Sequence, residues 1–167
     1  MPTAHHDFII TPHYSGSLRQ AAVRICAFMN CPFCEIVQGK APAFIVLEND
    51  YALAFLDARP LFPGHCLLIP KQHLETMADV PPGQIGPLFE EARLLSKAME
   101  TGLGAQGSFV AINNRISQSV PHLHIHVVPR KKKDGLKGFF WPRTPYNSED
   151  EMRAVQEKLR AALELRD

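Results

Sequence analysis

The chain has 167 residues, of which 46% are hydrophobic and 21% are charged, and its formal net charge is +1. These values are ordinary for a globular domain and exclude a disordered or fibrous chain. They also argue against nucleic acid or a membrane surface as a partner bound through overall charge. No apolar stretch could span a bilayer and no secretory signal is recognisable, so we expect a soluble cytoplasmic protein with one main domain.

The first 28 residues differ in composition from the rest of the chain. Histidine, proline, serine and glycine predict irregular structure, and an apolar stripe at helical spacing then predicts a short helix from Ser17 to Met29. We interpret residues 1–28 as an N-terminal extension without a part in the chemistry, and residues 29–167 as the functional domain.

A Cys-x-x-Cys turn, from Cys31 to Cys34, opens this domain and leads into a short helix that ends at Gly39. Residues 43–48 and 51–56 are rich in apolar and branched side chains, and an Asn-Asp pair separates them. This pattern predicts a β-hairpin.

Three more strands and one long helix are predicted after the hairpin. Residues 65–69 form a third strand, and a proline pair then starts a helix that ends at Gly102. Residues 108–113 form a fourth strand, and a polar loop leads to the fifth strand at residues 122–128. An aromatic loop and a charged helix from Ser148 to about residue 164 complete the chain, which predicts an α+β fold.

The fifth strand carries three histidines at a spacing of two. Because successive side chains of a strand point to opposite faces, the histidines would share one face and the apolar residues between them the other. The histidines are His122, His124 and His126, and the apolar residues are Leu123, Ile125 and Val127. Branched residues and flanking prolines favour this strand over a helix, in which the second histidine would point away from the other two.

A row of histidines can bind a metal, transfer protons or supply a nucleophile. A neutral imidazole attacks phosphorus well when its other nitrogen donates a hydrogen bond, and His124, with a histidine on each side, suits this role best. The preceding loop offers amide and hydroxyl groups that can bind phosphate, on Asn114, Ser117, Gln118 and Ser119. The basic run from Arg130 to Lys133 could also contact phosphate, although a solvated turn is the simpler interpretation.

The Cys-x-x-Cys turn provides half of a tetrahedral zinc site. His73 and His122 are the candidates for the other two ligands, because each lies at the end of a predicted strand and neither is needed as the nucleophile. A redox role is the alternative, but the strand and long helix of a thioredoxin-like motif are missing around Cys31 and Cys34. Cys26 and Cys66 are expected to be small apolar residues of the interior.

The segment from His122 to Val128, with its lead-in Gln118-Ser119-Val120, resembles the histidine triad (HIT) family. The similarity runs from Met29 to the C-terminal helix and includes residues 54–57 and 63–71. It implies a five-stranded antiparallel sheet with one long central helix and a C-terminal helix, assembled as a homodimer. It also implies hydrolysis or transfer of a nucleoside monophosphate through a covalent nucleotidyl-histidine.

The resemblance assigns roles to individual residues. His124 would be the nucleophile, His126 would contact the phosphate and help to protonate the leaving group, and His122 would orient its neighbour. In the zinc-containing, bacterial-type members a structural zinc is held at the positions of Cys31, Cys34, His73 and His122. Residues implied to bind the purine nucleotide are Asp57 for the ribose, Phe33, Ile36, Phe55 and Leu56 for the base, Asn114, Gln118 and Ser119 for the phosphates, and His65 beside the triad.

Two departures from the family pattern bear on these roles. Ser117 stands where the family commonly has glycine, and the loop that follows Asn113 is short, so Asn113 is an alternative to Asn114 as a phosphate contact. A third histidine, rather than glutamine, favours water over a sugar phosphate as the acceptor. The residues after the triad resemble dinucleoside polyphosphate hydrolases.

A diadenosine polyphosphate is therefore the first substrate expected from the sequence, because the segment Val128-Pro129-Arg130 resembles those hydrolases. A nucleoside phosphoramidase or a nucleotidyl-sulfate hydrolase is the alternative, since Trp141-Pro142 resembles the phosphoramidases. A nucleotide-binding interaction module with little activity is the alternative outside the enzymes.

Overall fold

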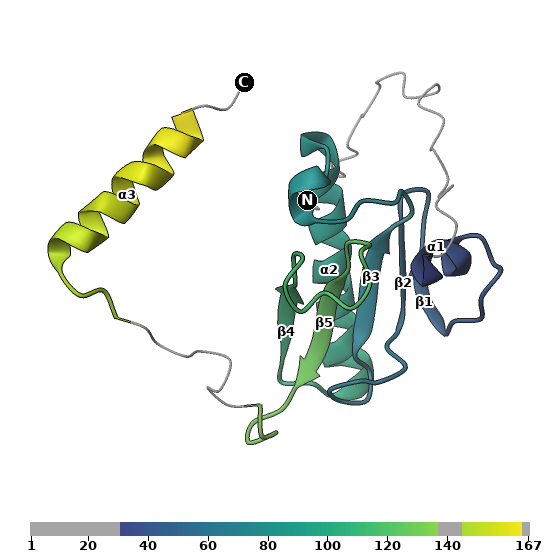
Figure 1. Ribbon diagram of the computed structural model, residues 1–167. Helices are drawn as coiled ribbons and strands as arrows, with labels where there is room; N and C mark the ends of the chain where they lie inside the picture. The colour runs from purple at the N-terminus through teal and green to yellow at the C-terminus, as the bar shows by residue number, and fades with distance from the viewer. Residues whose placement is uncertain (1–30, 137–144, 165–167) are drawn as a thin grey trace, which may run out of the picture. The chain divides into compact units, whose positions relative to one another are not determined.

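The computed structural model describes residues 31–136 and 145–164, so the expected N-terminal extension and its helix lie outside the described residues. The elements are α1 (Pro32–Val37), β1 (Ile45–Glu48), β2 (Ala52–Leu56), β3 (Cys66–Pro70), the 3-10 helix η1 (Met77–Asp79), α2 (Pro82–Leu103), β4 (Gly107–Ile112), β5 (Ile125–Arg130) and α3 (Glu149–Glu164). The five strands form one antiparallel sheet in the order β1-β2-β3-β5-β4 (Figure 1). The predicted α+β class, with its five strands, long helix and C-terminal helix, is confirmed. Among the described helices, none is both long and apolar enough to cross a membrane.

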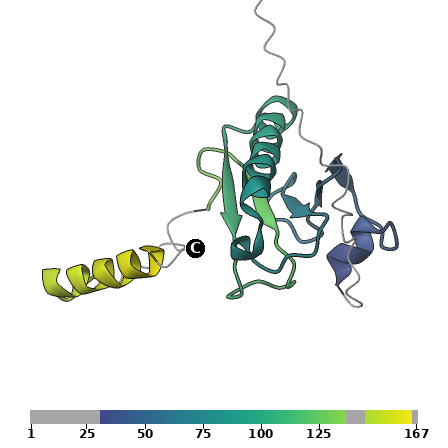
Figure 2. The same cartoon turned by 90° about the horizontal axis from the view of Figure 1, so that it is seen from above.

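Helix α2 runs along one face of the sheet (Figure 2). Its buried residues Leu88, Leu95 and Met99 pack in one core cluster with every second residue of the neighbouring strands. The helix ends at Gly104, whose φ of 61° is left-handed and whose N–H donates to the carbonyl of Met99. The expected end at Gly102 was therefore two residues early, because Gly104 adopts the conformation in which glycine is favoured.

The opposite side of the same strands carries a second apolar cluster. Leu53 and Phe55 of β2 belong to it, whereas Ala52 and Ala54 face α2. The cluster also includes Leu67, Ile69, Cys31, Phe33 and Cys34. The alternation of β2 and β3 thus places the Cys-x-x-Cys turn against the face of the sheet that is turned away from the long helix.

The histidine segment is a regular strand only in its second half. Strand β5 begins at Ile125, so the prediction of a strand that starts at His122 was wrong for its first three residues. Pro121 has no N–H to donate, and the N–H of Leu123 bonds to the carbonyl of Leu74, at 2.6 Å, instead of joining the ladder. The expected division of faces nevertheless holds, since Leu123, Ile125 and Val127 all lie in the core under α2.

The described residues after Lys132 belong to a second compact unit, which contains α3. The Ser148 hydroxyl accepts a hydrogen bond from the N–H of Glu151 at 3.1 Å, so the predicted N-cap of this helix is confirmed. Most of the predicted aromatic loop, residues 137–144, lies outside the described residues.

Candidate active site and metal centre

The four predicted zinc ligands meet beneath the Cys-x-x-Cys turn. Cys31 and Cys34 come from α1 and its N-cap, His73 follows β3, and His122 precedes β5. One ligand atom from each of the four lies within 4.8 Å of the other three. The cysteines and His122 are buried, and His73 is half-buried.

The spacing of these atoms fits a tetrahedral zinc ion. In tetrahedral geometry, zinc bonds of about 2.3 Å to sulfur and about 2.0–2.1 Å to nitrogen place a sulfur ligand and a nitrogen ligand about 3.5 Å apart. Nδ1 of His122 lies 3.5 Å from Sγ of Cys31 and 3.7 Å from Sγ of Cys34, and Nδ1 of His73 lies 3.3 Å from Sγ of Cys34. With four protein ligands the ion would be structural, as expected from the sequence.

The outer nitrogen of His122 supports this arrangement. Its Nε2–H donates to the carbonyl of Pro70 at 2.9 Å, which leaves Nδ1 unprotonated and directed at the two sulfur atoms. Burial lowers the pKa of His122 to about 4, so the ring is neutral, the form that binds a metal.

His124 is held in the tautomer that a nucleophile needs. Its Nδ1–H donates to the carbonyl of His122 at 2.7 Å, so the lone pair is on Nε2. The ring is buried, with a relative exposure of 3%, and makes edge-on contacts with Phe33 and His126, with ring centroids 5.4 Å and 5.0 Å away. A neutral imidazole fixed through one nitrogen can attack phosphorus with the other.

His126 is connected to His65 in a chain of hydrogen bonds. The N–H of Leu61 donates to Nδ1 of His65 at 3.2 Å, so the proton of His65 is on Nε2 and is donated to Nδ1 of His126 at 3.0 Å. The remaining proton of His126 is then on Nε2, where it can be donated to a phosphate oxygen or a leaving group. Oδ2 of Asp57 lies 3.4 Å from Nδ1 of His65, but the backbone amide can only donate and takes this nitrogen as its acceptor.

Burial keeps both of these histidines neutral. Burial, together with the neighbouring rings of His124 and His65, lowers the pKa of His126 to about 4. Burial also lowers the pKa of His65, against the opposing effect of the Asp57 carboxylate. Near neutral pH the pair therefore acts through hydrogen bonding rather than through positive charge.

The predicted base-binding residues are divided by the sheet. Phe33 and Phe55 are buried on the histidine side with their ring centroids 5.4 Å apart, and Ile36 packs against the same cluster. Leu56 is the exception: it lines an apolar hollow of about 360 Å³ together with Leu95 and other residues of α2. Neighbouring residues of a strand point to opposite faces, which explains why Phe55 and Leu56 are separated. Leu56 is therefore not brought together with the other predicted base contacts.

The polar residues of the loop before the triad are used to hold the loop in place. The Asn114 Oδ1 accepts from the N–H of Met77 at 2.8 Å. The Gln118 amide donates to the carbonyl of Glu75 at 2.6 Å and accepts from the N–H of Arg115 at 2.6 Å. Ser119 is exposed beside them. Residues 75–77, with the short helix η1, were not identified from the sequence, because three residues show no periodicity.

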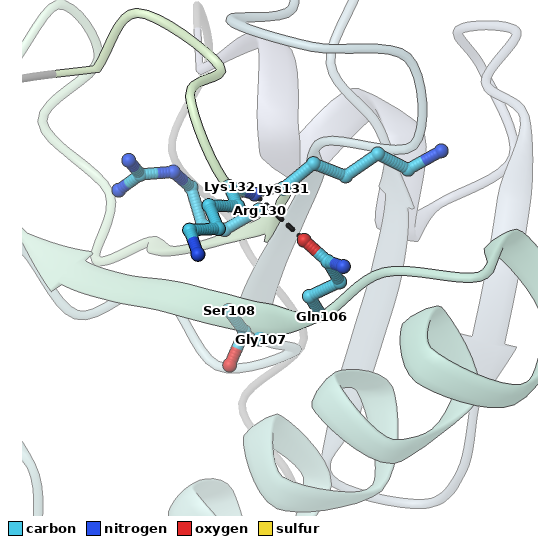
Figure 3. Close-up of a pocket in the computed structure, with 6 residues that line it drawn as sticks. All are labelled: Gln106, Gly107, Ser108, Arg130, Lys131 and Lys132. Carbon is cyan, nitrogen blue, oxygen red and sulfur yellow. Dashed lines mark hydrogen bonds between the residues drawn. The ribbon is translucent and has the colours of Figure 1, made fainter.

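The basic run lies at the far end of β5. Arg130, Lys131 and Lys132 line a hollow of about 520 Å³ with Gln106 and Ser108, and the Gln106 side chain accepts from the backbone N–H of Lys132 at 2.8 Å (Figure 3). Arg130 is four residues from His126 along the strand, and none of the predicted site residues lines this hollow.

The HIT domain model matches residues 38–133, more than half of the chain. The chain belongs to the HIT family. Among HIT relatives, it is 33% identical to the adenylylsulfatase HINT3 of Arabidopsis thaliana over 81% of this chain and 70% of that protein. It is 34% identical to the adenosine 5′-monophosphoramidase hnt1 of Schizosaccharomyces pombe over 78% of this chain and 96% of that protein.

A zinc-bound histidine triad family protein from Mycobacterium smegmatis has a similar structure. The TM-score is 0.62 and the identity 37%, over 80% of this chain and 97% of that one. This relative, together with the four-residue cluster, confirms the prediction of a zinc-containing HIT protein.

Proposed function

We propose that this HIT protein hydrolyses a nucleotide at its α-phosphate and that His124 forms the covalent intermediate. The observation that carries the proposal is the hydrogen bond from Nδ1–H of His124 to the carbonyl of His122, at 2.7 Å, which leaves Nε2 as the nucleophilic atom. In the first step Nε2 forms a bond to phosphorus as the bond to the leaving group breaks. Water then cleaves the phosphorus–nitrogen bond and releases a nucleoside monophosphate.

His126 serves the leaving group in this proposal. Its Nε2–H, fixed by the hydrogen bond between Nδ1 and His65, donates to the oxygen or nitrogen that departs. A neutral donor suits this position because a cationic ring would be strongly disfavoured by burial beside His124 and His65.

Adenosine 5′-phosphoramidate and adenosine 5′-phosphosulfate are the substrates we propose to test first. Support comes from the relatives named as a monophosphoramidase and an adenylylsulfatase, which the chain resembles over most of its length. A diadenosine polyphosphate, the first choice from the sequence, stays a prediction. The purine would lie against Phe33, Ile36 and Phe55, and Asp57 would accept hydrogen bonds from the ribose hydroxyls.

A substrate panel tests the function. The wild type, His124→Ala and His13→Ala would each be incubated with the phosphoramidate, the phosphosulfate and a diadenosine polyphosphate, and release of AMP measured. His13→Ala is the control, since it removes a histidine of the extension. We expect His124→Ala to lose at least about a thousandfold in kcat/KM. Acid quenching should trap an adenylylated wild-type protein that His124→Ala does not form.

Two results would reject the enzymatic proposal. Equally slow release of AMP by the wild type and His124→Ala on all three substrates would show that no turnover depends on the nucleophile. Micromolar binding of AMP in calorimetry without turnover would favour the interaction module instead.

We also propose that the protein is a homodimer joined through β4. Strands β1 and β4 are the edges of the described sheet, and β1 is short and irregular between Ile45 and Leu47, which discourages pairing. Strand β4 is regular, and Val110 on it is 41% exposed. Sedimentation should give a dimer for the wild type and a monomer for Val110→Asp. A monomeric wild type would reject the proposal.

A further inference from the structure

Phe33 links the metal-binding turn to the proposed nucleophile. It lies between Cys31 and Cys34 in the first turn of α1, and its side chain is buried. Its ring meets His122 edge-on at 5.8 Å and His124 edge-on at 5.4 Å, with an angle of 83° between the Phe33 and His124 planes. One aromatic side chain thus contacts both a metal ligand and the nucleophile.

The hydrogen bond to the His122 carbonyl fixes one atom of the His124 ring but not the whole ring. An imidazole held through Nδ1 alone can still rotate about its side-chain bonds, which would swing Nε2 away from the phosphorus. Neighbouring side chains can restrict this rotation, and the rings that contact His124 are Phe33 and His126. Because His126 must also serve the leaving group, Phe33 is the partner whose contact with His124 is purely steric.

The position of Phe33 depends on what holds α1. This helix has six residues, and its N-cap, Cys31, makes no capping hydrogen bond through its side chain. Helices of this length are not stable by themselves. Contacts that attach α1 to the sheet include the apolar cluster around Phe55 and the cluster of Cys31 and Cys34 with the two histidines.

We propose that Phe33 is a positioning residue for His124, and that zinc, by tying the Cys31–Cys34 turn to the sheet, keeps Phe33 against the nucleophile. The proposal rests on the proposed function for its catalytic consequence. Whether the metal-binding turn orders the His124 imidazole can be measured without any turnover of substrate.

The test compares Phe33→Leu with Phe55→Leu in zinc-loaded, ligand-free protein. Each variant replaces one phenyl ring of the same cluster with a smaller aliphatic side chain. Of the two rings, Phe33 is the one that contacts His124. Histidine ring ¹⁵N spectra at one pH near neutrality report the tautomer and exchange broadening of each imidazole. We expect the His124 signals of the wild type to show a single Nδ1–H tautomer. In Phe33→Leu they should broaden or show both tautomers, whereas in Phe55→Leu they should stay in place.

Kinetics separate positioning from binding of the base. For Phe33→Leu we expect kcat at saturating substrate to fall about 10- to 100-fold, because misplacement of a reacting atom affects the chemical step. A role in base binding alone would raise KM and leave kcat unchanged. An unchanged His124 spectrum in Phe33→Leu, or a change in KM only, would overturn the positioning role.

Removal of zinc from the wild type with a chelator tests the part played by the metal. We expect the His124 signals to change as they do in Phe33→Leu, while the amide signals of β5 persist. Unchanged His124 signals, or loss of the whole folded spectrum, would overturn the proposal that zinc keeps Phe33 against His124. If the wild type proves inactive on every nucleotide, the spectra still decide whether the turn orders His124, so the two proposals fail separately.

Discussion

Two groups of histidines lie side by side in this protein and differ in what their nitrogen atoms contact. In the metal centre, His122 directs Nδ1 at two sulfur atoms and gives Nε2–H to the carbonyl of Pro70, so both nitrogens are used. In the proposed active site, His124 and His126 each have one nitrogen in a hydrogen bond to the protein and Nε2 left for a ligand. The three histidines are thus distinguished by their hydrogen bonds: both nitrogens of His122 have contacts, whereas His124 and His126, the proposed reactive rings, each keep Nε2 for a ligand.

The two groups are joined through the backbone. The carbonyl of His122, a metal ligand, accepts the hydrogen bond that fixes His124. We therefore expect damage to the metal centre to reach the active site, whereas damage to the active site should leave the metal centre intact. Variants on either side of this connection should reveal the asymmetry.

The largest effect is expected from Cys31→Ser. A serine hydroxyl is a poor zinc ligand, so metal content should fall below about half an equivalent and the free energy of unfolding should fall by at least about 3 kcal/mol. Metal analysis and urea unfolding measure the two quantities. The matched control is Cys66→Ser, a buried cysteine of β3 outside the cluster, which should keep its zinc. A Cys31→Ser protein with full zinc would contradict the proposed ligand set.

His126→Ala should separate chemistry from metal binding. Loss of the Nε2–H donor should lower kcat/KM for the phosphoramidate about 100-fold, because a positioned proton donor contributes about that much or more. Zinc content should equal that of the wild type, since His126 is outside the metal cluster. If the variant loses zinc as well, the two groups are not separable and the asymmetry is wrong.

The free energy of unfolding should depend on pH through His126. Its pKa is about 4 when folded and 6.5 when unfolded, so between these values the unfolded chain binds a proton that the folded protein excludes. Stability should fall as the pH is lowered from about 6.5 to about 4, by about 1–2 kcal/mol from this group, after allowance for its partial exposure. The groups that face it are His65, Asp57 and His124. His126→Gln should show a smaller loss over the same range in urea unfolding, and an equal loss would assign the pH dependence elsewhere.

Much of the fold was predictable from the sequence because its signals are local and repeated. Alternation identified the strands, and helical spacing with flanking proline and glycine identified α2. The errors occurred where long-range contacts override these signals. The strand ladder begins three residues later than expected because the N–H of Leu123 bonds to Leu74, a residue 49 positions earlier in the sequence.

The metal cluster was predictable to the residue, whereas the supporting contacts were not. The spacing of Cys31 and Cys34 restricts the chemistry strongly, and the two histidines followed from their places at predicted strand ends, in agreement with the family pattern. The carbonyl of Pro70 and the amide of Leu61 fix histidine tautomers, but backbone atoms carry no sequence signature. Alternation along β2 was the available signal that Leu56 points toward α2, because its neighbour Phe55 was expected on the other face.

The smallest effect is expected at Ser117, where the family commonly has glycine. Its φ is 59°, in the left-handed region where a side chain is strained, in the loop that precedes the triad. Ser117→Gly should therefore raise the free energy of unfolding by about 0.5–1 kcal/mol, the relieved strain exceeding the added entropy of the unfolded chain. Ile116→Gly is the matched control: this neighbour is 82% exposed and has no positive φ, so glycine there should lower stability. Urea unfolding measures both changes, and equal losses in the two variants would show that the turn is not strained at Ser117. Because neither Ile116 nor Ser117 belongs to the metal cluster, zinc content should be the same in both variants.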